Sequence, residues 1–234
     1  FQCAFCYNTA LRTGYRAAPL ERVEAELDRA CQIYHPREIL FYDDNFCVRK
    51  DRALAIGEML AKRGLAWDVD IRVDGIERGF IRELVRLGCR GVFVGVESGA
   101  DAVLKRLSKG FMAADAERAM AVLREERMAS TTCALMTGTP GETRGELLAT
   151  WRFMRKVWFP GLSFSLKMFQ LLPGTKLAST CLRQGARIPQ TLREWAETGG
   201  WLTTYLNQSA MTGAEVRLYT WAMRKAAGLR ARLG

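Results

Sequence analysis

The chain has 234 residues, of which 49% are hydrophobic, so it can bury a full core and has the size of one large α/β domain or barrel. Seven scattered cysteines argue against a disulfide framework and favour a reducing compartment, so we expect a cytoplasmic protein. No apolar run approaches the roughly 18 residues that a membrane helix needs. The formal charge of +10 is spread over most predicted helices and concentrates only at residues 217–232, so we expect no nucleic-acid partner.

The first candidate motif is the pair Cys3 and Cys6 at the start of the chain. A Cys-x-x-Cys pair turns both sulfurs toward one point, so it can be half of a zinc site, a redox dithiol or part of an iron–sulfur ligand set. A structural zinc site needs four Cys or His ligands. The remaining candidates are isolated in the sequence: Cys31, His35, Cys47, Cys89, Cys133 and Cys181. Zinc is therefore disfavoured, while the dithiol and the iron–sulfur interpretations both stay open.

Hydrophobic periodicity predicts strands that alternate with helices along the chain. Strands are expected at residues 38–42, 68–73, 91–96, 131–137 and 163–169, the first of them short and buried. Helices are expected at residues 19–34, 51–64, 77–87 and 143–158, with one more around residues 119–123. This order favours right-handed parallel βαβ units and hence an α/β fold.

Local residues indicate where several of these helices begin and end. Pro19 suits the first position of one helix, and Asp51 is expected to cap the next helix, which stops at Gly64. Thr143 and Glu146 form a predicted capping box at the start of the helix at residues 143–158.

Polar residues and glycines gather directly after the predicted strands. They are Asp43, Asp44, Glu97, Ser98, Gly138 and Glu142. In β/α barrels the loops at the carboxyl ends of the strands build the active site, so we expect these residues at the same end as the cysteine pair. His35 precedes a strand and is expected on the opposite face.

The aromatic Phe5 before Cys6 and the Tyr7-Asn8 after it resemble the end of the radical SAM signature Cys-x3-Cys-x2-Cys. Roughly residues 1–175 look like the core domain of that superfamily. The resemblance implies that Cys3 and Cys6 are two of three ligands of a [4Fe–4S] cluster and that the first ligand lies upstream of Phe1. It also implies that the open iron binds S-adenosylmethionine (SAM), which is cleaved to a 5′-deoxyadenosyl radical that abstracts hydrogen from an organic substrate.

The same resemblance implies a partial (β/α)6 TIM-like barrel whose first strand, like the first cysteine, lies upstream. We expect this core at residues 1–185 and a C-terminal helical extension at residues 186–234. Aromatic residues of the extension are expected to pack in a core and not to line a substrate pocket: Trp195, Trp201, Tyr205, Tyr219 and Trp221.

The resemblance assigns SAM-binding roles to residues near the strand ends. Phe5 would lie by the adenine, or pack beside the cluster. Asp43-Asp44-Asn45 would accept hydrogen bonds from the methionine ammonium, with helix capping by Asn45 as the alternative. Arg72 would pair with a carboxylate of SAM or substrate, or form an ion pair with Glu97.

Three further segments match positions that contact SAM in the family. Glu97-Ser98 would lie near the ribose hydroxyls or the methionine group. Gly138-Thr139-Pro140-Gly141 looks like the glycine turn where backbone approaches the adenosine, although a plain turn would need the same glycines. Pro173, after the last strand, resembles the segment that closes over the adenine.

Three phrases look most like the radical SAM class that carries a cobalamin domain ahead of the core: residues 41–46, residues 95–99 and Lys109-Gly110. This implies cobalamin as a further cofactor, bound by a domain outside this chain, and a methyltransferase or related radical enzyme. We expect a small-molecule or lipid-like substrate and an electron donor such as flavodoxin or ferredoxin. The alternatives are a methylthiotransferase-like radical SAM enzyme that modifies RNA, and a redox dithiol protein that uses Cys3 and Cys6.

Overall fold

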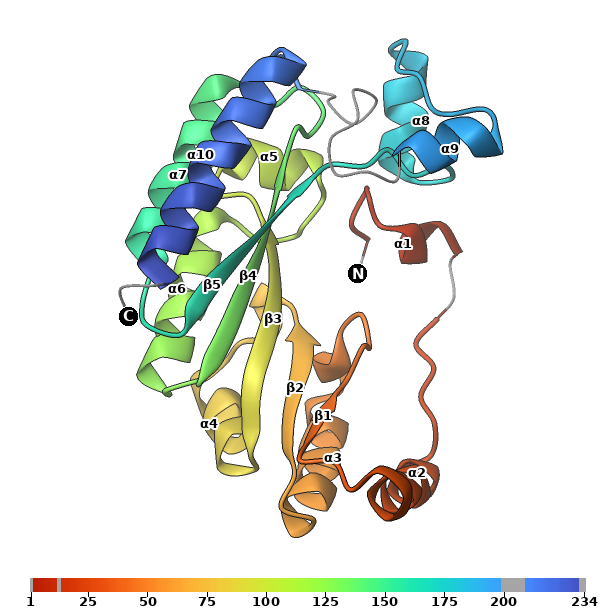
Figure 1. Ribbon diagram of the computed structural model, residues 1–234, viewed down its shortest axis with the longest axis vertical. Coiled ribbons are helices and arrows are strands. Elements are labelled where there is room, and N and C mark those ends of the chain that lie inside the picture. Colours follow the sequence, from red (N-terminus) through yellow and green to blue (C-terminus); the bar gives the residue numbers. More distant parts are fainter. Residues whose placement is uncertain (1, 12–13, 199–208, 232–234) are drawn as a thin grey trace.

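A sheet of five parallel strands forms the centre of the computed structural model, which describes residues 2–11, 14–198 and 209–231 (Figure 1). The strands are β1 (Glu38–Leu40), β2 (Ala66–Ile71), β3 (Cys89–Glu97), β4 (Ser130–Thr137) and β5 (Leu162–Met168). They neighbour one another in chain order, and every neighbouring pair is parallel. The expected α/β fold with a partial TIM-like barrel is thus confirmed.

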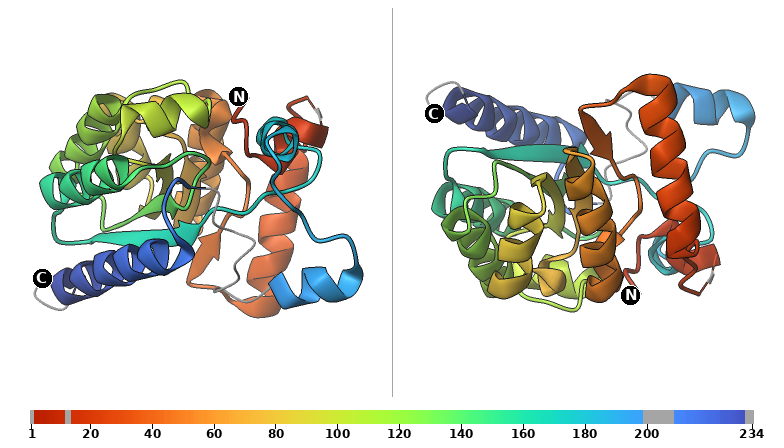
Figure 2. Two further views of the ribbon diagram at one scale, coloured as in Figure 1. Left: turned by 90° about the horizontal axis from the view of Figure 1, so that it is seen from above. Right: turned by 90° about the horizontal axis from the view of Figure 1, so that it is seen from below.

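Helices cover the outer face of this curved sheet and one of its edges (Figures 1 and 2). Those of the crossovers are α3 (Lys50–Lys62), α4 (Arg78–Arg86), α5 (Asp101–Arg106), α6 (Ala113–Glu125) and α7 (Arg144–Val157). The others are α1 (Tyr7–Leu11), α2 (Leu20–Tyr34), α8 (Lys176–Arg183), α9 (Leu192–Thr198) and α10 (Gly213–Ala231), the last of which packs along β5. None of the described helices is both long and apolar enough to cross a membrane.

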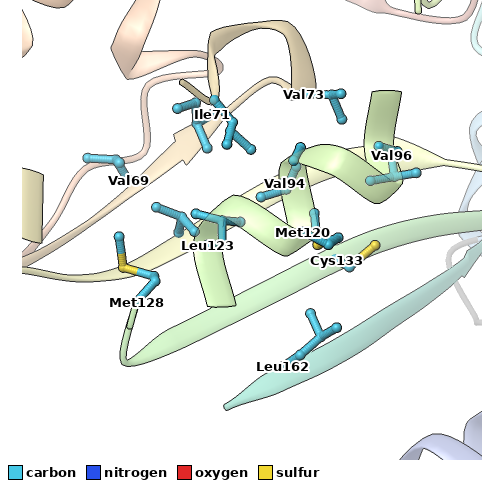
Figure 3. Packing of buried hydrophobic residues seen from close by; sticks show 14 of the residues in the cluster. Val69, Ile71, Val73, Val94, Val96, Met120, Leu123, Met128, Cys133 and Leu162 are labelled. Carbon is cyan, nitrogen blue, oxygen red and sulfur yellow. The ribbon is translucent and has the colours of Figure 1, made fainter. Parts of the chain in front are cut away.

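Alternation along the strands separates a buried outer face from a polar concave face. In β2, Trp67, Val69 and Ile71 are buried, whereas Asp68 and Asp70 between them are only half-buried. Figure 3 shows the outer layer, where side chains of β2 to β4 meet those of α6. Burying each such aliphatic side chain contributes about 1.5–3 kcal/mol, so this layer holds the helices on the sheet and leaves the concave face for polar chemistry.

The predicted helix signals are partly confirmed. The Thr143–Glu146 capping box is present, with the backbone N–H of Glu146 donating to Thr143 Oγ1 at 3.3 Å and that of Thr143 donating to Glu146 Oε2 at 2.8 Å. Gly64, with a φ of +66°, follows α3 as expected. Asp51 is not the cap, because α3 begins one residue before it and the Asp51 carboxylate pairs with Arg49 at 2.7 Å.

Other boundaries differ from the prediction by a few residues. Pro19 stands at the N-cap of α2 and not inside it. β1 ends at Leu40, and it is not buried: Leu40 is 51% exposed because β1 is an edge strand of the described sheet and pairs with β2 alone. β2 lies two residues earlier than expected, which places Arg72 just beyond the strand end.

The predictions for the aromatic residues of the C-terminal extension are confirmed in part. Tyr219 packs against the main core as expected, but Trp221 is 59% exposed, so the prediction that it is a core residue is wrong. Trp201 and Tyr205 lie outside the described residues. The position of a domain boundary at residue 185 stays a prediction.

Candidate cofactor site

The cysteine loop is fastened at Ala4, between its two cysteines. The backbone N–H of Ala4 donates to the carbonyl of Leu107 at 2.9 Å, just beyond α5, and its carbonyl accepts from Leu177 of α8 at 2.9 Å. The N–H of Cys6 donates to the carbonyl of Cys3 at 3.1 Å, which closes a turn. These three bonds fix the loop at the carboxyl ends of the strands.

Cys3 is buried and faces Arg72, whose Nη1 donates to its sulfur at 3.3 Å. The guanidinium also binds Asp74 through Nε at 3.0 Å and the carbonyl of Lys109 through Nη2 at 2.7 Å. A thiolate, the form of cysteine that binds metals, is a good acceptor for such a cationic donor. Arg72 thus anchors Cys3 at the carboxyl end of β2.

Lys109 lies between the cysteine loop and β3. Its side chain is 4% exposed, and its Nζ pairs with Glu97 Oε1 at 3.2 Å. The same ammonium lies 5.7 Å from the centroid of the Phe5 ring and 5.4 Å from that of Phe111. The ion pairs found here are therefore Lys109–Glu97 and Arg72–Asp74, so the Arg72–Glu97 pair, one of the two alternatives that the sequence offered, is not formed.

Glu97 adopts a left-handed backbone conformation with φ 77°, which is strained for a residue with a side chain. The register of β3 against β4 shifts between Gly95 and Glu97 at this point. A Cβ added to Gly95 would lie 2.9 Å from Glu97 Oε1, so a larger residue at this position would require the carboxylate to shift. The bulge and the glycine together direct Glu97 toward Lys109.

The acidic segment after β1 also reaches the cysteine loop. Asn8 Nδ2 donates to Asp44 Oδ2 at 2.5 Å, and Asp43 and Asp44 are exposed. Asn45 stands at the N-cap of the 3-10 turn Phe46–Val48, but its side chain makes no capping bond. Burial, together with the charges of Asp44 and Asp43, raises the pKa of Asp70, so these three carboxylates share one electrostatic environment.

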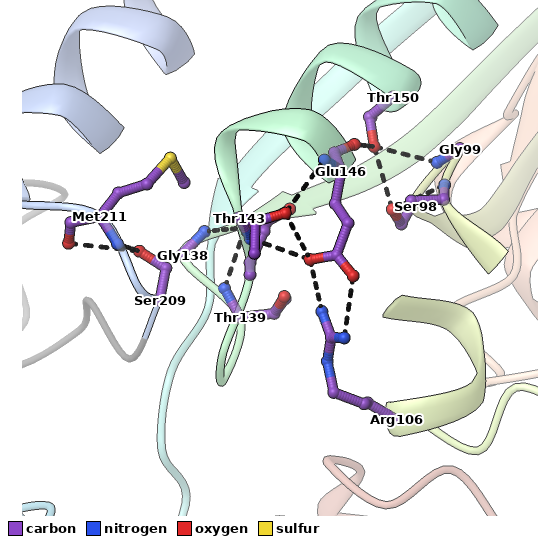
Figure 4. Close-up of polar contacts among 12 residues, drawn as sticks. Ser98, Gly99, Arg106, Gly138, Thr139, Thr143, Glu146, Thr150, Ser209 and Met211 are labelled. Atoms are coloured by element: carbon purple, nitrogen blue, oxygen red, sulfur yellow. Dashed lines mark hydrogen bonds and ion pairs between the residues drawn. The ribbon is translucent and has the colours of Figure 1, made fainter. Parts of the chain in front are cut away.

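Ser98 is bonded to α7. Its hydroxyl lies 2.9 Å from Thr150 Oγ1 of α7 and accepts from the N–H of Ala100 at 3.1 Å, as Figure 4 shows in part. A Cβ on the adjacent Gly99 would lie 2.4 Å from that of Phe153, so this turn packs directly on α7. Ser98 thus fixes the backbone after Glu97, and its predicted contact with a cofactor stays a prediction.

The glycine turn after β4 is built around the buried carboxylate of Glu142. That carboxylate accepts from the backbone N–H of Gly138 at 2.7 Å and of Thr139 at 3.2 Å (Figure 4 shows both donors). Gly138 and Gly141 have φ values of 78° and 67°, which favour glycine. Burial raises the pKa of Glu142 to about 7, although the two N–H donors act in the opposite direction.

This raised pKa predicts a pH-dependent stability that Glu142→Gln removes. The folded chain keeps a proton on Glu142 that the unfolded chain releases above its ordinary pKa of 4.5, so the contribution is present at low pH and is lost as pH rises toward 7. Between about pH 5 and pH 8 we expect the unfolding free energy of wild type to fall by about 2 kcal/mol relative to Glu142→Gln. Urea titrations at both pH values measure this difference.

The exposed Glu58 of α3 provides the matched control for that measurement. Glu58→Gln should track wild type at both pH values. If the unfolding free energies of wild type and Glu142→Gln differed by the same amount at both pH values, the proton on Glu142 would have no part in stability.

A cleft of about 530 Å³ joins the glycine turn to the cysteine loop. Pro140 and Gly141 line it on one side, and Ala4 with the first turns of α8 lines it on the other. Pro173 is exposed just before Thr175, whose hydroxyl caps α8 by accepting from Ala178 at 3.2 Å. The structure therefore brings the cysteine loop, the turn and the segment after β5 together at one end of the sheet.

Sequence reasoning missed several members of the site. Asp70 could have been found, because it shares one face of β2 with Asp68 and lies two residues before Arg72. Lys109 lies in a short connection after α5, where no periodicity distinguishes a buried lysine from a solvated one. Asp74 and Phe111 also lie in short connections, where periodicity gives no signal.

A partial parallel barrel with a cysteine loop at the carboxyl ends of its strands is an arrangement suited to a metal cofactor and a bound small molecule. A sequence profile of the radical SAM superfamily matches residues 1–154, so the chain belongs to that superfamily. Members carry a [4Fe–4S] cluster and use SAM, and these are accordingly the cofactors of this enzyme.

Two relatives resemble the chain in sequence. It is 29% identical over 181 residues to an uncharacterized methyltransferase of Pyrococcus horikoshii, a match that covers 76% of this chain and 39% of the relative. It is 31% identical over 176 residues to the ribosomal protein uS12 methylthiotransferase RimO of Geobacter sulfurreducens, with 68% and 38% covered. The chain therefore spans about two fifths of the length of these relatives.

Solved structures share the fold. The radical SAM methyltransferase TsrM of Kitasatospora setae, with cobalamin and a [4Fe–4S] cluster bound, has a TM-score of 0.66 at 22% identity and covers 82% of this chain and 36% of its own. The coproporphyrinogen III oxidase HemN of Escherichia coli has a TM-score of 0.61 at 16% identity, with 88% and 50% covered. The cobalamin-dependent radical enzyme OxsB has 0.60 at 17% identity, with 96% and 34% covered.

The residues present fit such a cluster. Cys3 and Cys6 share a closed turn, and the buried cations Arg72 and Lys109 lie where an anionic cluster needs compensation. Within the described part of the chain, no group of three or more His, Cys, Asp or Glu side chains could hold a metal by itself. The cysteines of the core are unsuited, since burial raises the pKa of Cys47 to about 12 and raises that of Cys89 and Cys133 as well.

Proposed function

We propose that this chain is the catalytic core of a cobalamin-dependent radical SAM methyltransferase and that Cys3, Cys6 and a third cysteine upstream hold the cluster. The observation that carries the cofactor assignment is a continuous line of contacts from Cys3 through Arg72 and Lys109 to Glu97. It links the metal-binding thiol to a carboxylate at the end of the neighbouring strand. Cluster and SAM sites would then be held at a fixed separation.

Different residues of this chain would bind different groups of SAM. Asp44, oriented by Asn8, offers a carboxylate to the methionine ammonium, and Glu97, fixed by Lys109, offers one to hydroxyl or ammonium groups. The turn at Gly138–Gly141, shaped by Glu142, offers backbone to the adenosine. Arg72 is already bonded to Cys3, Asp74 and a carbonyl, so we assign it to positioning the cysteine loop and not to a cofactor carboxylate.

The cluster and SAM, when bound, supply a 5′-deoxyadenosyl radical that abstracts hydrogen from the substrate. The methyltransferase part of the proposal is supported by the name of the Pyrococcus relative and by the fold shared with TsrM and OxsB. A domain that binds cobalamin would lie outside this chain, on the face that carries Cys3, Asp44 and Glu97. The substrate would be a small or lipid-like molecule, with an external electron donor.

A second candidate is a methylthiotransferase, which the Geobacter relative favours by its 31% identity. The two differ in what the substrate receives, a methyl group or a methylthio group. Product analysis by mass spectrometry therefore separates them.

The test uses the full-length protein, reconstituted without oxygen and supplied with SAM and dithionite. We expect 5′-deoxyadenosine, and methyl transfer only when cobalamin is present. Asp44→Asn and Glu97→Gln should keep full iron while weakening SAM binding by about 1 to 3 kcal/mol, because each leaves hydrogen-bonding groups without a partner. Equilibrium dialysis with labelled SAM measures this, and Glu58→Gln, an exposed carboxylate on α3, is the control.

Two results would overturn parts of the proposal. Deoxyadenosine formation that needs no cobalamin and is accompanied by no group transfer would favour a simpler radical SAM oxidoreductase or isomerase. Loss of iron in Asp44→Asn or Glu97→Gln would make these residues structural supports of the cluster and not SAM ligands.

A further inference from the structure

We propose that two buried cations, Arg72 and Lys109, raise the reduction potential of the cluster, and so act on its electronic state as well as holding the cysteine loop in place. This inference rests on the proposed cluster at Cys3 and Cys6. Taking up one electron makes a cluster more negative, so N–H donors to its sulfurs and cations beside it favour the reduced state. Arg72 supplies such a donor, and Lys109 supplies a charge.

The guanidinium of Arg72 has its direction fixed by its acceptors. Its Nε and Nη2 donate to the carboxylate of Asp74 at 3.0 and 3.1 Å, and Nη2 also donates to the carbonyl of Lys109 at 2.7 Å. Its Nη1 donates to the sulfur of Cys3 at 3.3 Å. The planar fork of an arginine makes all these bonds at once, which a lysine cannot do. The side chain of Asp74 is 40% exposed and that of Arg72 is 11% exposed, so water screens the carboxylate more than the guanidinium.

Lys109 brings a second buried cation to the cysteine loop. Its ammonium lies 5.7 Å from the ring centroid of Phe5, which belongs to that loop. The side chains of Lys109 and its partner Glu97 are 4% and 13% exposed. Lys109 Nζ and Arg72 Cζ lie 5.4 and 5.8 Å from the ring centroid of Phe111. The fields of charges in such apolar surroundings are screened less than in water, so we expect both cations to act on the cluster.

The ion pair between Lys109 and Glu97 allows a test of sign. Lys109→Met leaves the carboxylate of Glu97 unbalanced, so it should lower the midpoint potential of the cluster. Glu97→Gln leaves the ammonium of Lys109 unbalanced, so it should raise the midpoint potential. The double variant removes both charges and should return the potential close to that of wild type. A loop that is only loosened gives no reason for the two single variants to shift the potential in opposite directions.

The experiment is a potentiometric titration of the full-length protein, reconstituted without oxygen and with no SAM added. Electron paramagnetic resonance measures the reduced cluster at each potential. Dithionite loses each electron and is oxidised, and the cluster gains that electron and is reduced, with no bond made or broken in the protein. Only clusters that are present give the signal, so loss of iron by itself does not move the midpoint potential.

Arg72→Gln should lower the ratio of reduced to oxidised cluster at the wild-type midpoint about tenfold, which corresponds to a midpoint potential about 59 mV lower. Arg72→Lys keeps the charge but loses the fork, so its midpoint should lie between those of Arg72→Gln and wild type. The control Arg29→Gln removes an exposed cation on α2 and should leave the midpoint unchanged. If Arg72→Gln binds no cluster, Arg72→Lys and the variants of Lys109 and Glu97 provide the test.

Three results would overturn the inference or its basis. A wild-type midpoint in the clusters that Arg72→Gln retains, or in Arg72→Lys if Arg72→Gln retains none, would leave Arg72 as a support of the loop alone. Shifts of the same sign in Lys109→Met and Glu97→Gln would overturn the role of Lys109. Wild-type protein that binds no iron would instead refute the proposed cluster at Cys3 and Cys6.

Discussion

Replacement of Lys109 by methionine is expected to lower the free energy of unfolding by about 3 kcal/mol, because it leaves a mostly buried carboxylate without its cation. The side chains of Lys109 and Glu97 are only 4% and 13% exposed, and their charged atoms lie 3.2 Å apart. Methionine keeps the packing of the lysine stem against Phe5 and Phe111, so the lost charge dominates the effect. Urea unfolding at neutral pH measures it.

An exposed ion pair provides the control for this measurement. Lys156 pairs with Glu117 at 2.5 Å but is 67% exposed, so Lys156→Met should change stability by less than about 1 kcal/mol. Adding Glu97→Gln to Lys109→Met should restore part of the loss, since no unpaired charge then remains. If Lys109→Met and Lys156→Met lowered the free energy of unfolding by the same amount, Lys109 and Glu97 would not be a buried pair whose charges depend on each other.

The sequence was most informative where chemistry is local. The capping box at Thr143 and Glu146 needs only the four residues that span it, and it formed as predicted. Hydrophobic patterns predicted where the strands lie to within a few residues, and so placed both acidic residues near strand ends: Asp44 lies in the loop after β1, and Glu97 is the last residue of β3. These signals predicted parallel βαβ units with polar residues near the carboxyl ends of the strands, whereas the partial barrel was implied by the resemblance to the radical SAM core.

The features that the sequence did not predict depend on contacts in the folded structure. Whether β1 is buried depends on its neighbours in space, and its exposed Leu40 could not be distinguished from a core leucine in the sequence. The contact of Arg72 with Cys3 was not predicted, because the two residues are far apart in the sequence; its ion pair with Asp74 was not among the two alternatives that the sequence offered. Glu142 was expected at the carboxyl ends of the strands, but its burial, with its own turn bonded to its carboxylate, was not predicted.

Exchange of Cys3 or Cys6 for alanine is expected to remove the cluster, which is the largest single effect that we predict. Each supplies a thiolate from a loop fixed at Ala4, and no other described cysteine lies on that loop. Two thiolates do not hold the cluster that three thiolates hold, so a cluster missing one of them should be lost on desalting. Cys31, half-buried on α2, supplies the control Cys31→Ala, which should retain the cluster.

Iron and sulfide analysis of these three variants is the most direct test of the cofactor site. In full-length protein reconstituted without oxygen, wild type and Cys31→Ala should hold about four iron and four sulfide per chain. Cys3→Ala and Cys6→Ala should both fall to background, with far-UV circular dichroism unchanged. A full complement of iron and sulfide in both Cys3→Ala and Cys6→Ala would contradict the assignment of these residues as cluster ligands.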